Sequence, residues 1–291
     1  MTTWIETIHE LIAKASTDLA PDVASAIQAA VRVEEAGSNA QQALATILEN
    51  TSLARAKRLP LCQDTGTLVF EVWAPSALRP ALLREAIHAA IGPATVAGML
   101  RRNSVDSLTG ENAAANVGPG HPVIHWHEHA GDQVRITLLL KGGGSENVGT
   151  QYSLPDNELG AGRDLAGVRR CVLDAVHRAQ GKGCSPGILG VAIGGDRATG
   201  YAASKEQFLR RIGERSPDPK LAAFEERVLA EANSLGIGPM GFGGKTTLLE
   251  VFATALNRVP ASYFVTISYM CWAFRRRSVT ASLAGEALGW E

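Results

Sequence analysis

The spacing of apolar residues predicts that the chain begins with helices. Trp4, Ile8, Leu11 and Ile12 recur at helical spacing. A second helix is predicted from Pro21 to about residue 33, and a third over residues 39–58, where Pro60 then disfavours any continuation. Residues 1–60 are therefore predicted to form a helical N-terminal portion.

Beyond residue 60 the pattern alternates between short apolar runs and amphipathic segments. Strands are predicted over residues 68–73, 122–129, 134–140, 188–193, 247–255 and 261–271. Helices are predicted over residues 80–91, 96–102, 162–180, 198–212 and 219–235. The polar segment 103–120 is predicted to be a long loop, a kind of segment that is usually functional or disordered. The expected fold is α/β of the α+β type: one domain over residues 1–291, with mixed β-sheets flanked by helices after the helical portion.

Composition narrows the class of protein. The chain has 291 residues, of which 45% are hydrophobic, and a net charge of −1, which gives no reason to expect nucleic acid or an anionic membrane as partner. No apolar run approaches the length of a membrane span, and the N-terminus lacks the basic and apolar regions of a secretory signal. We therefore expect a cytoplasmic protein whose four cysteines are reduced.

Three of the four cysteines lie at predicted strand ends. Cys62 lies in the sequence Leu-Cys-Gln-Asp-Thr-Gly, a predicted turn before a strand, and Cys184 repeats this arrangement before the strand at 188. Cys271 ends the last predicted strand, whereas Cys171 lies among the apolar positions of a helix and is predicted to belong to the core. Each cysteine in a turn could be a small buried apolar residue, a nucleophile or a metal ligand.

A run of three glycines follows the strand at 134–140. In Lys-Gly-Gly-Gly-Ser-Glu-Asn, residues 141–147, the missing side chains would leave backbone amides free to face a ligand. The alternative is a flexible hairpin. The polar residues directly after a buried strand favour the binding segment.

Two other patterns do not support the sites that they suggest. His125, His127 and His129 share one face of a predicted strand, but successive residues on that face are about 7 Å apart, so the outer pair is too distant to share one ion. The segment ending in Gly-Gly-Lys245-Thr suggests a phosphate-binding loop. That motif requires a glycine where Pro239 stands, and it requires a preceding strand where a helix is predicted.

The motifs around Cys62, the glycine run, Cys184, Lys245 and Cys271 occur in one order along the chain. Together they closely resemble the class I fumarase and L-tartrate dehydratase family, at its N-terminal (alpha) region, over nearly the whole chain. This resemblance implies a hydro-lyase that interconverts a 2-hydroxy dicarboxylate and its dehydrated product, with fumarate and L-malate as the first expectation and L-tartrate as the alternative. It also implies a [4Fe–4S] cluster with three cysteine ligands and one open iron.

Carried over residue by residue, the resemblance implies that Cys62, Cys184 and Cys271 are the cluster ligands. Gln63 and Asp64 are implied as catalytic groups on the substrate side, with Asp64 in the proton-transfer network. Arg101, with Arg102 as the competing choice, is implied to bind one substrate carboxylate. The backbone around Gly143 and Gly144 is implied to hold the other.

The chain departs from the family pattern in two places. It ends at Glu291 without the C-terminal domain of single-chain members, so it resembles the alpha subunit of the two-subunit form. The resemblance then implies a beta subunit as partner, in a heteromer that itself dimerises, with the general base on that partner. Some relatives have a histidine where this chain has Val259, which leaves the substrate open. A non-catalytic iron–sulfur scaffold subunit is the third alternative, although such a protein has no need of Gln63 and Asp64.

Overall fold

A computed structural model describes all residues, 1–291, and has the α/β architecture that the sequence predicts. The residues group into two compact units, each made of segments that are distant in sequence. The first unit contains Met1–Ala20, Glu49–Gly143 and Ala273–Glu291, and the second contains Pro21–Leu48 and Gly144–Trp272. Whether they work as one domain over residues 1–291 stays a prediction.

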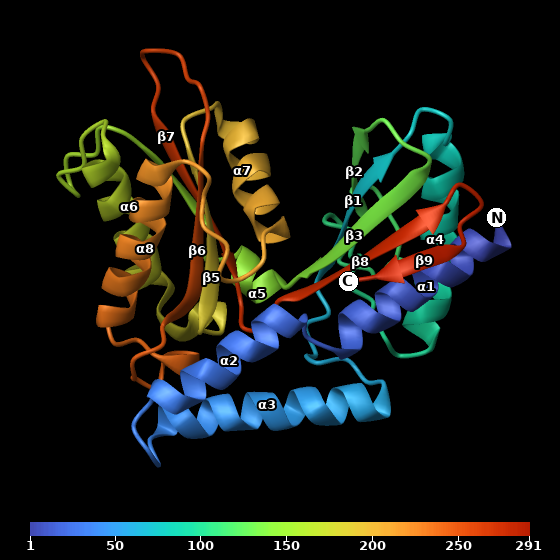
Figure 1. The fold of residues 1–291 in the computed structure, drawn as a ribbon, viewed down its shortest axis with the longest axis horizontal. Coiled ribbons are helices and arrows are strands. Elements are labelled where there is room, and N and C mark those ends of the chain that lie inside the picture. Colours follow the sequence, from blue (N-terminus) through green and yellow to red (C-terminus); the bar gives the residue numbers. More distant parts are fainter. The chain divides into compact units, whose positions relative to one another are not determined.

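The first unit is built on a five-stranded sheet of order β2-β1-β3-β8-β9 (Figure 1). Its strands are β1 (Thr67–Ala74), β2 (Val123–Glu128), β3 (Gln133–Lys141), β8 (Arg275–Ser282) and β9 (Ala287–Trp290). β1 pairs with β2 in parallel, and the other pairs are antiparallel. Helices α1 (Thr2–Thr17) and α4 (Pro80–Val96) pack against each other, and α1 also lies against β3 and β8. Apolar residues of the two helices and of β1, β3 and β8 form one buried core.

The second unit contains a four-stranded sheet of order β4-β7-β5-β6. Its strands are β4 (Thr150–Ser153), β5 (Gly187–Ile193), β6 (Leu248–Ala255) and β7 (Phe264–Met270). Figure 1 shows α6 (Leu165–Ala179) and α8 (Pro219–Ser234) on one face of the sheet and α7 (Arg197–Glu206) on the other. Both faces of β5 are therefore covered, which agrees with its wholly buried sequence, Gly-Ile-Leu-Gly-Val-Ala-Ile.

The three N-terminal helices form as predicted, and they are shared between the units. α2 (Pro21–Val33) belongs to the second unit, and α3 (Asn39–Lys57) contributes residues to both. Short helices complete the chain: α5 (Gly143–Glu146), η1 (Gln180–Gly183), η2 (Gln207–Leu209) and η3 (Pro239–Gly241). None of the helices combines the length and the apolar composition that crossing a bilayer requires.

The predicted separate helix over residues 96–102 is wrong. α4 continues through Pro93 to Val96, and the chain then turns at Gly98, which has φ +76° and so takes the left-handed backbone that commonly ends a helix. Arg101 and Arg102 therefore lie in irregular chain after this turn and not at the end of a helix.

The sequence does not predict three of the strands, which are β4, β8 and β9. β4 has only four residues, and β8 begins with three arginines, a composition that does not suggest a strand. The structure places β8 beside β3, and the arginines of β8 contact different groups there. Arg276 stacks on the ring of Phe274, and Arg277 donates to Asp18 and to the carbonyl of Leu19.

Candidate functional site

The 62–66 turn lies in the first unit, between the end of α3 and β1, as predicted. Asp64 shapes it, because Oδ1 accepts a hydrogen bond from the backbone N–H of Gly66 at 3.1 Å. Gly66 has φ +78°, and a Cβ at this residue would lie 2.6 Å from the carbonyl carbon and oxygen of Lys141. Only glycine lets the turn approach the end of β3 this closely.

This close approach brings Asp64 beside the glycine run. A Cβ on Gly142 would lie 3.0 Å from Asp64 Oδ2, and a Cβ on Gly143 would lie 3.9 Å from the same atom. The predicted catalytic carboxylate and the first part of the predicted carboxylate-binding segment are thus neighbours within one unit. Gly144 is exposed and begins the second unit.

Arg101 is tied to the 62–66 turn by side chain and backbone. Its guanidinium Nη1 donates to the carbonyl of Gln63 at 3.4 Å, and its backbone N–H donates to the buried hydroxyl of Thr65 at 3.0 Å. Arg102 is exposed, and its backbone carbonyl accepts a hydrogen bond from the amide of Asn112 at 2.6 Å. Of the two candidate arginines, Arg101 is the one whose side chain reaches the turn.

Sequence reasoning missed Asn116, which organises the segment after Arg101. Its side chain is fully buried, and its Oδ1 accepts from the backbone N–H groups of Asn103 and Ser104, each at 2.9 Å. Its Nδ2 donates to the carbonyl of Arg101 at 2.9 Å. Asn116 thus fixes the backbone position of the arginine. The abundance of asparagine in a loop of this length was the only signal in the sequence.

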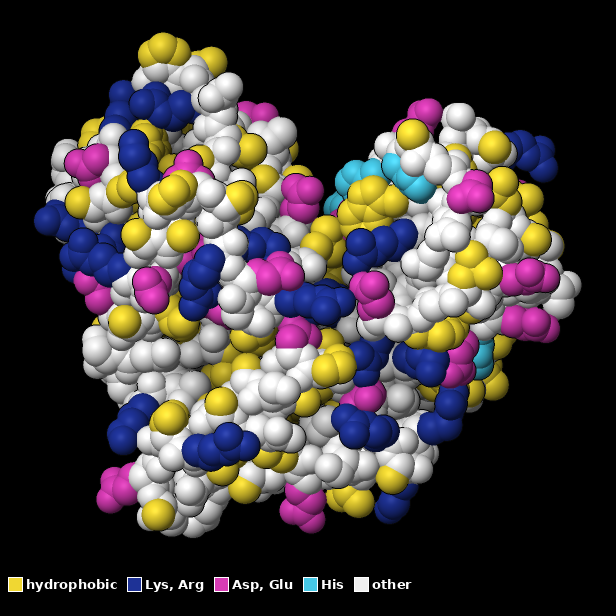
Figure 2. All heavy atoms as spheres, in the orientation of Figure 1, with side chains coloured by type: hydrophobic (Ala, Val, Ile, Leu, Met, Phe, Trp, Pro, Cys, Tyr) yellow, Lys and Arg dark blue, Asp and Glu magenta, His cyan; other side chains and the backbone are white.

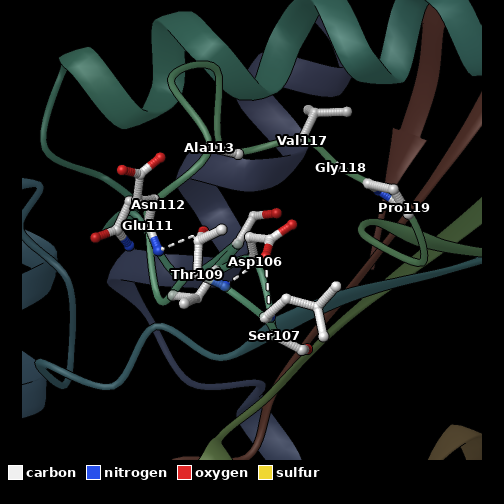
Figure 3. A pocket seen from close by; sticks show the side chains of 12 residues that line it. Asp106, Ser107, Thr109, Glu111, Asn112, Ala113, Val117, Gly118 and Pro119 are labelled. Carbon is white, nitrogen blue, oxygen red and sulfur yellow. Dashed lines mark hydrogen bonds between the residues drawn. The ribbon is translucent and has the colours of Figure 1, made fainter.

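The same loop encloses an open cavity of about 580 Å³ in the first unit, drawn in Figure 3. The carboxylate of Asp106 accepts from the backbone N–H groups of Thr109 and Leu108, which lowers the pKa of this exposed side chain. The residues that line the cavity lie between Ser104 and Pro119 and include none of the predicted site residues. Its polar groups stabilise the loop, so we do not assign the chemistry to it.

In the second unit, Cys184 and Cys271 are predicted ligands that lie close together. The backbone N–H of Trp272, the residue after Cys271, donates to the carbonyl of Cys184 at 3.2 Å. Cys184 has left-handed backbone, with φ 56° and ψ 64°, which turns the chain sharply ahead of β5. The next residue is held in turn, because Ser185 Oγ donates to the carbonyl of Gly238 at 2.6 Å. Cys62 belongs to the first unit.

Tyr269 supports the Cys184 turn from inside the second unit. A Cβ on Gly183 or Gly187, the glycines on either side of Cys184, would lie 2.6 or 2.2 Å from its ring. The Tyr269 hydroxyl is buried without a hydrogen-bond partner, and burial, with the nearby thiols of Cys271 and Cys184, raises its pKa. Glycine is therefore needed at both positions, because the ring of Tyr269 packs against the turn that contains Cys184.

Cys171 differs from the other cysteines, as predicted. It is fully buried in the core of the second unit, and burial raises its pKa to about 12, with smaller contributions from Asp156 and Asp174. None of the four cysteines forms a disulfide, and Cys62 and Cys184 are half-buried. Cys171 therefore has the environment of a core residue and not of a ligand.

Two histidines of β2 lie within hydrogen-bond distance of a buried carboxylate. His125 Nδ1 and His127 Nε2 lie 2.6 and 2.7 Å from the two oxygens of Glu71 on β1. Trp73 stacks on His127 with ring centroids 4.9 Å apart. Figure 2 shows histidines (cyan) gathered over β2. The predicted shared strand face is confirmed for His125 and His127, which are partly exposed on the edge strand β2, whereas His129 follows the end of this strand. Glu71 explains why the two histidines lie there.

Comparison with known proteins identifies the family. A model of the family described as fumarate hydratase (fumerase) matches residues 5–280. A putative class I fumarate hydratase of Geobacillus stearothermophilus is 47% identical over 289 residues, which are 98% of this chain and 56% of that protein. A putative L(+)-tartrate dehydratase subunit alpha of Methanocaldococcus jannaschii is 34% identical over 93% of this chain and 95% of its own length.

An L(+)-tartrate dehydratase subunit alpha of Escherichia coli is 31% identical over 93% of this chain and 88% of its own length. The chain thus spans little more than half of the Geobacillus relative and nearly all of the two alpha subunits. The family match covers most of the chain and includes every predicted site residue. The chain therefore belongs to the family of class I fumarate hydratases and L(+)-tartrate dehydratase alpha subunits.

Proposed function

We propose that this chain is the catalytic alpha subunit of an iron–sulfur hydro-lyase that interconverts fumarate and L-malate in the cytoplasm. The observation that carries the proposal is the packing of the 62–66 turn, with Asp64, against Gly142, together with the hydrogen bond from Arg101 to this turn. A carboxylate, an arginine and a glycine-rich backbone are the groups that proton transfer on a dicarboxylate requires. The 47% identity to a putative class I fumarate hydratase favours fumarate over tartrate.

The proposed cofactor is a [4Fe–4S] cluster held by Cys62, Cys184 and Cys271. The chemistry of these residues fits it, because all three are thiols outside any disulfide, in turns or at strand ends, and thiolates are the usual ligands of such clusters. A cluster with one open iron supplies a Lewis acid for the substrate hydroxyl. Val259, where some relatives have a histidine, is exposed between β6 and β7 and offers no titratable group.

The chain's own residues would then divide the work. Arg101 binds one substrate carboxylate, and the backbone amides of Gly143 and Gly144 hold the other. Asp64 takes part in proton transfer, while its Oδ1 remains engaged with Gly66. Gln63 is exposed and carries an amide that can donate to a substrate oxygen.

We further propose a beta subunit that completes the enzyme in a dimerising heteromer. The relatives that this chain covers almost from end to end are named as alpha subunits, which supports a separate partner. A dicarboxylate carries two negative charges, and enclosing it needs more cations than Arg101 provides. The partner is proposed to supply them, together with the general base.

The test is a steady-state assay on anaerobically prepared protein, alone and with its partner. Fumarate hydration and L-tartrate dehydration are measured in parallel, with iron content determined for every sample. We expect fumarate turnover only in the complex. Preferential turnover of L-tartrate would support the alternative substrate. An iron-loaded complex that turns over neither substrate would contradict the catalytic proposal and favour a scaffold subunit.

A further inference from the structure

Arg275, the first residue of β8, is a buried cation whose side chain is largely unpaired. It is 1% exposed, and its Nη2 makes a long hydrogen bond of 3.5 Å to the carbonyl of Leu140. Its Nε and Nη1 have no hydrogen-bond partner. The neighbouring arginines differ, because Arg276 stacks on an aromatic ring and Arg277 is paired with Asp18.

Such a residue needs an explanation beyond packing. A guanidinium stays charged in proteins and offers five donors, so burying one without a full set of acceptors is unfavourable. The same low-polarity surroundings strengthen its effect on any charge nearby. A buried, underpaired arginine therefore points to a neighbouring anion on which it acts.

The nearest functional anion in the first unit is Asp64. The pairing of Leu140 with Arg275 sets the arginine beside the end of β3, just before the glycine run. A Cβ on Gly142 would lie 3.0 Å from Asp64 Oδ2 and 3.8 Å from Arg275 Nη2. Carboxylate and guanidinium thus flank the same glycine, and the absence of a side chain there leaves room for both groups.

We propose that Arg275 is a positioning residue for Asp64. Its charge holds the Asp64 carboxylate directed toward Gly142 and Gly143, while Oδ1 is engaged by Gly66. Because Nε and Nη1 are inaccessible, Arg275 acts through Asp64 and does not touch the substrate. The proposal rests on the proposed function and adds a residue that no sequence motif indicates.

A double-mutant cycle in the complete enzyme tests this proposal. The variants are Arg275→Gln, Arg275→Lys, Asp64→Asn and the double variant Arg275→Gln/Asp64→Asn, each assayed for kcat, KM, iron content and thermal unfolding. We expect Arg275→Gln to lower kcat by about tenfold with little change in KM, within the range measured for coupled neighbours. We expect Arg275→Lys to retain most of kcat, and Arg275→Gln to cost nothing further once Asp64 is Asn.

Arg277→Gln is the matched control, since it also removes an arginine from β8 but breaks the pair with Asp18. It should lower thermal stability and leave kcat unchanged. If Arg275→Gln fails to fold, the cycle is run with Arg275→Lys, whose displaced charge should give a smaller effect that again vanishes with Asp64→Asn.

Three results would overturn the proposal. Additive losses in kcat would show that Arg275 does not act through Asp64. Equal loss in Arg275→Lys and Arg275→Gln, together with loss of iron, would show a purely structural role. An inactive wild-type complex would overturn the proposed function as well, whereas an active wild type with an additive cycle overturns only the role of Arg275.

Discussion

The carboxylate of Glu34 accepts a hydrogen bond from the backbone N–H of Lys245, with 2.9 Å between Oε2 and the nitrogen. Its Oε1 accepts from the N–H of Thr246 at 2.8 Å. These are amides of the Gly-Gly-Lys-Thr segment, which in a phosphate-binding loop would face the nucleotide. In this protein the buried side chain of Glu34, the residue after α2, already satisfies them.

We therefore predict that the chain does not bind ATP or GTP and that Glu34 stabilises the second unit. Glu34→Ala leaves two backbone donors without their carboxylate and should lower the free energy of unfolding by about 2 kcal/mol. The exposed neighbour Glu35 provides the control, because Glu35→Ala should change stability by less than about 0.5 kcal/mol. Denaturant titration measures both. Equal stability of the two variants, or tight nucleotide binding by either, would contradict this assignment.

The thiol of Cys171 should resist alkylation in the reduced, iron-free chain at pH 8. Burial raises its pKa to about 12, so the reactive thiolate is scarce, whereas Cys62 and Cys184 are half-buried and should react first. Because the folded pKa exceeds the ordinary value of 9.0, the protonated thiol stabilises the fold below pH 9.0, and this contribution is lost as the pH rises toward 12.

Mass spectrometry after iodoacetamide treatment reads out each site. In guanidinium all four cysteines should be labelled. If Cys171 in the native chain is labelled as fast as Cys62, the face of α6 that carries Cys171 is accessible to solvent, which would contradict its assignment to the core.

Gly66→Ala should lower stability by about 2 kcal/mol or more and reduce turnover. The substitution forces a side chain into left-handed backbone at φ +78° and places its Cβ 2.6 Å from the carbonyl of Lys141. Relief of this contact moves the glycine run away from Asp64. Gly110→Ala is the matched control, because Gly110 lies in the same unit at φ +75° with nothing within 4 Å. Thermal unfolding and kcat should be compared, and similar losses in both variants would remove the role of the close approach.

Arg101→Ala should raise KM for the dicarboxylate by about tenfold or more, the usual scale for a hydrogen bond between charged groups. Arg102→Ala should change KM by less than about twofold, since only Arg101 reaches the 62–66 turn. Steady-state kinetics of the two variants in the complex decide between them. A larger effect of Arg102→Ala would reverse the assignment.

Much of the fold could be predicted from the sequence, because its elements carry strong local signals. The wholly apolar run of β5 and the helical spacing of α1 are examples. β8 could not be predicted in the same way. It begins with three arginines, whose charged side chains do not indicate a strand. These arginines fit the strand because they contact Phe274, Asp18 and the end of β3, and these contacts form only in the folded unit.

The candidate site shows the same division. Asp64, Arg101 and the glycine run were chosen from motifs, and the structure brings Asp64, Arg101 and Gly142 to one turn. Thr65 and Asn116, which hold Arg101 in place, were not chosen, because a buried threonine and a buried asparagine look ordinary until their hydrogen bonds are known. Glu71 could not be identified from the sequence for the same reason, because its partners, His125 and His127, lie on another strand.

The proposed cluster ligands are tested most directly by iron analysis of four single variants: Cys62→Ser, Cys184→Ser, Cys271→Ser and Cys171→Ser. Each is purified and reconstituted without oxygen, and iron and acid-labile sulfide are measured per chain. We predict about four irons in the wild type and in Cys171→Ser, as a [4Fe–4S] cluster requires, and loss of the cluster in the other three variants. Retention of the full cluster by Cys62→Ser, Cys184→Ser or Cys271→Ser, or its loss from Cys171→Ser alone, would contradict the account.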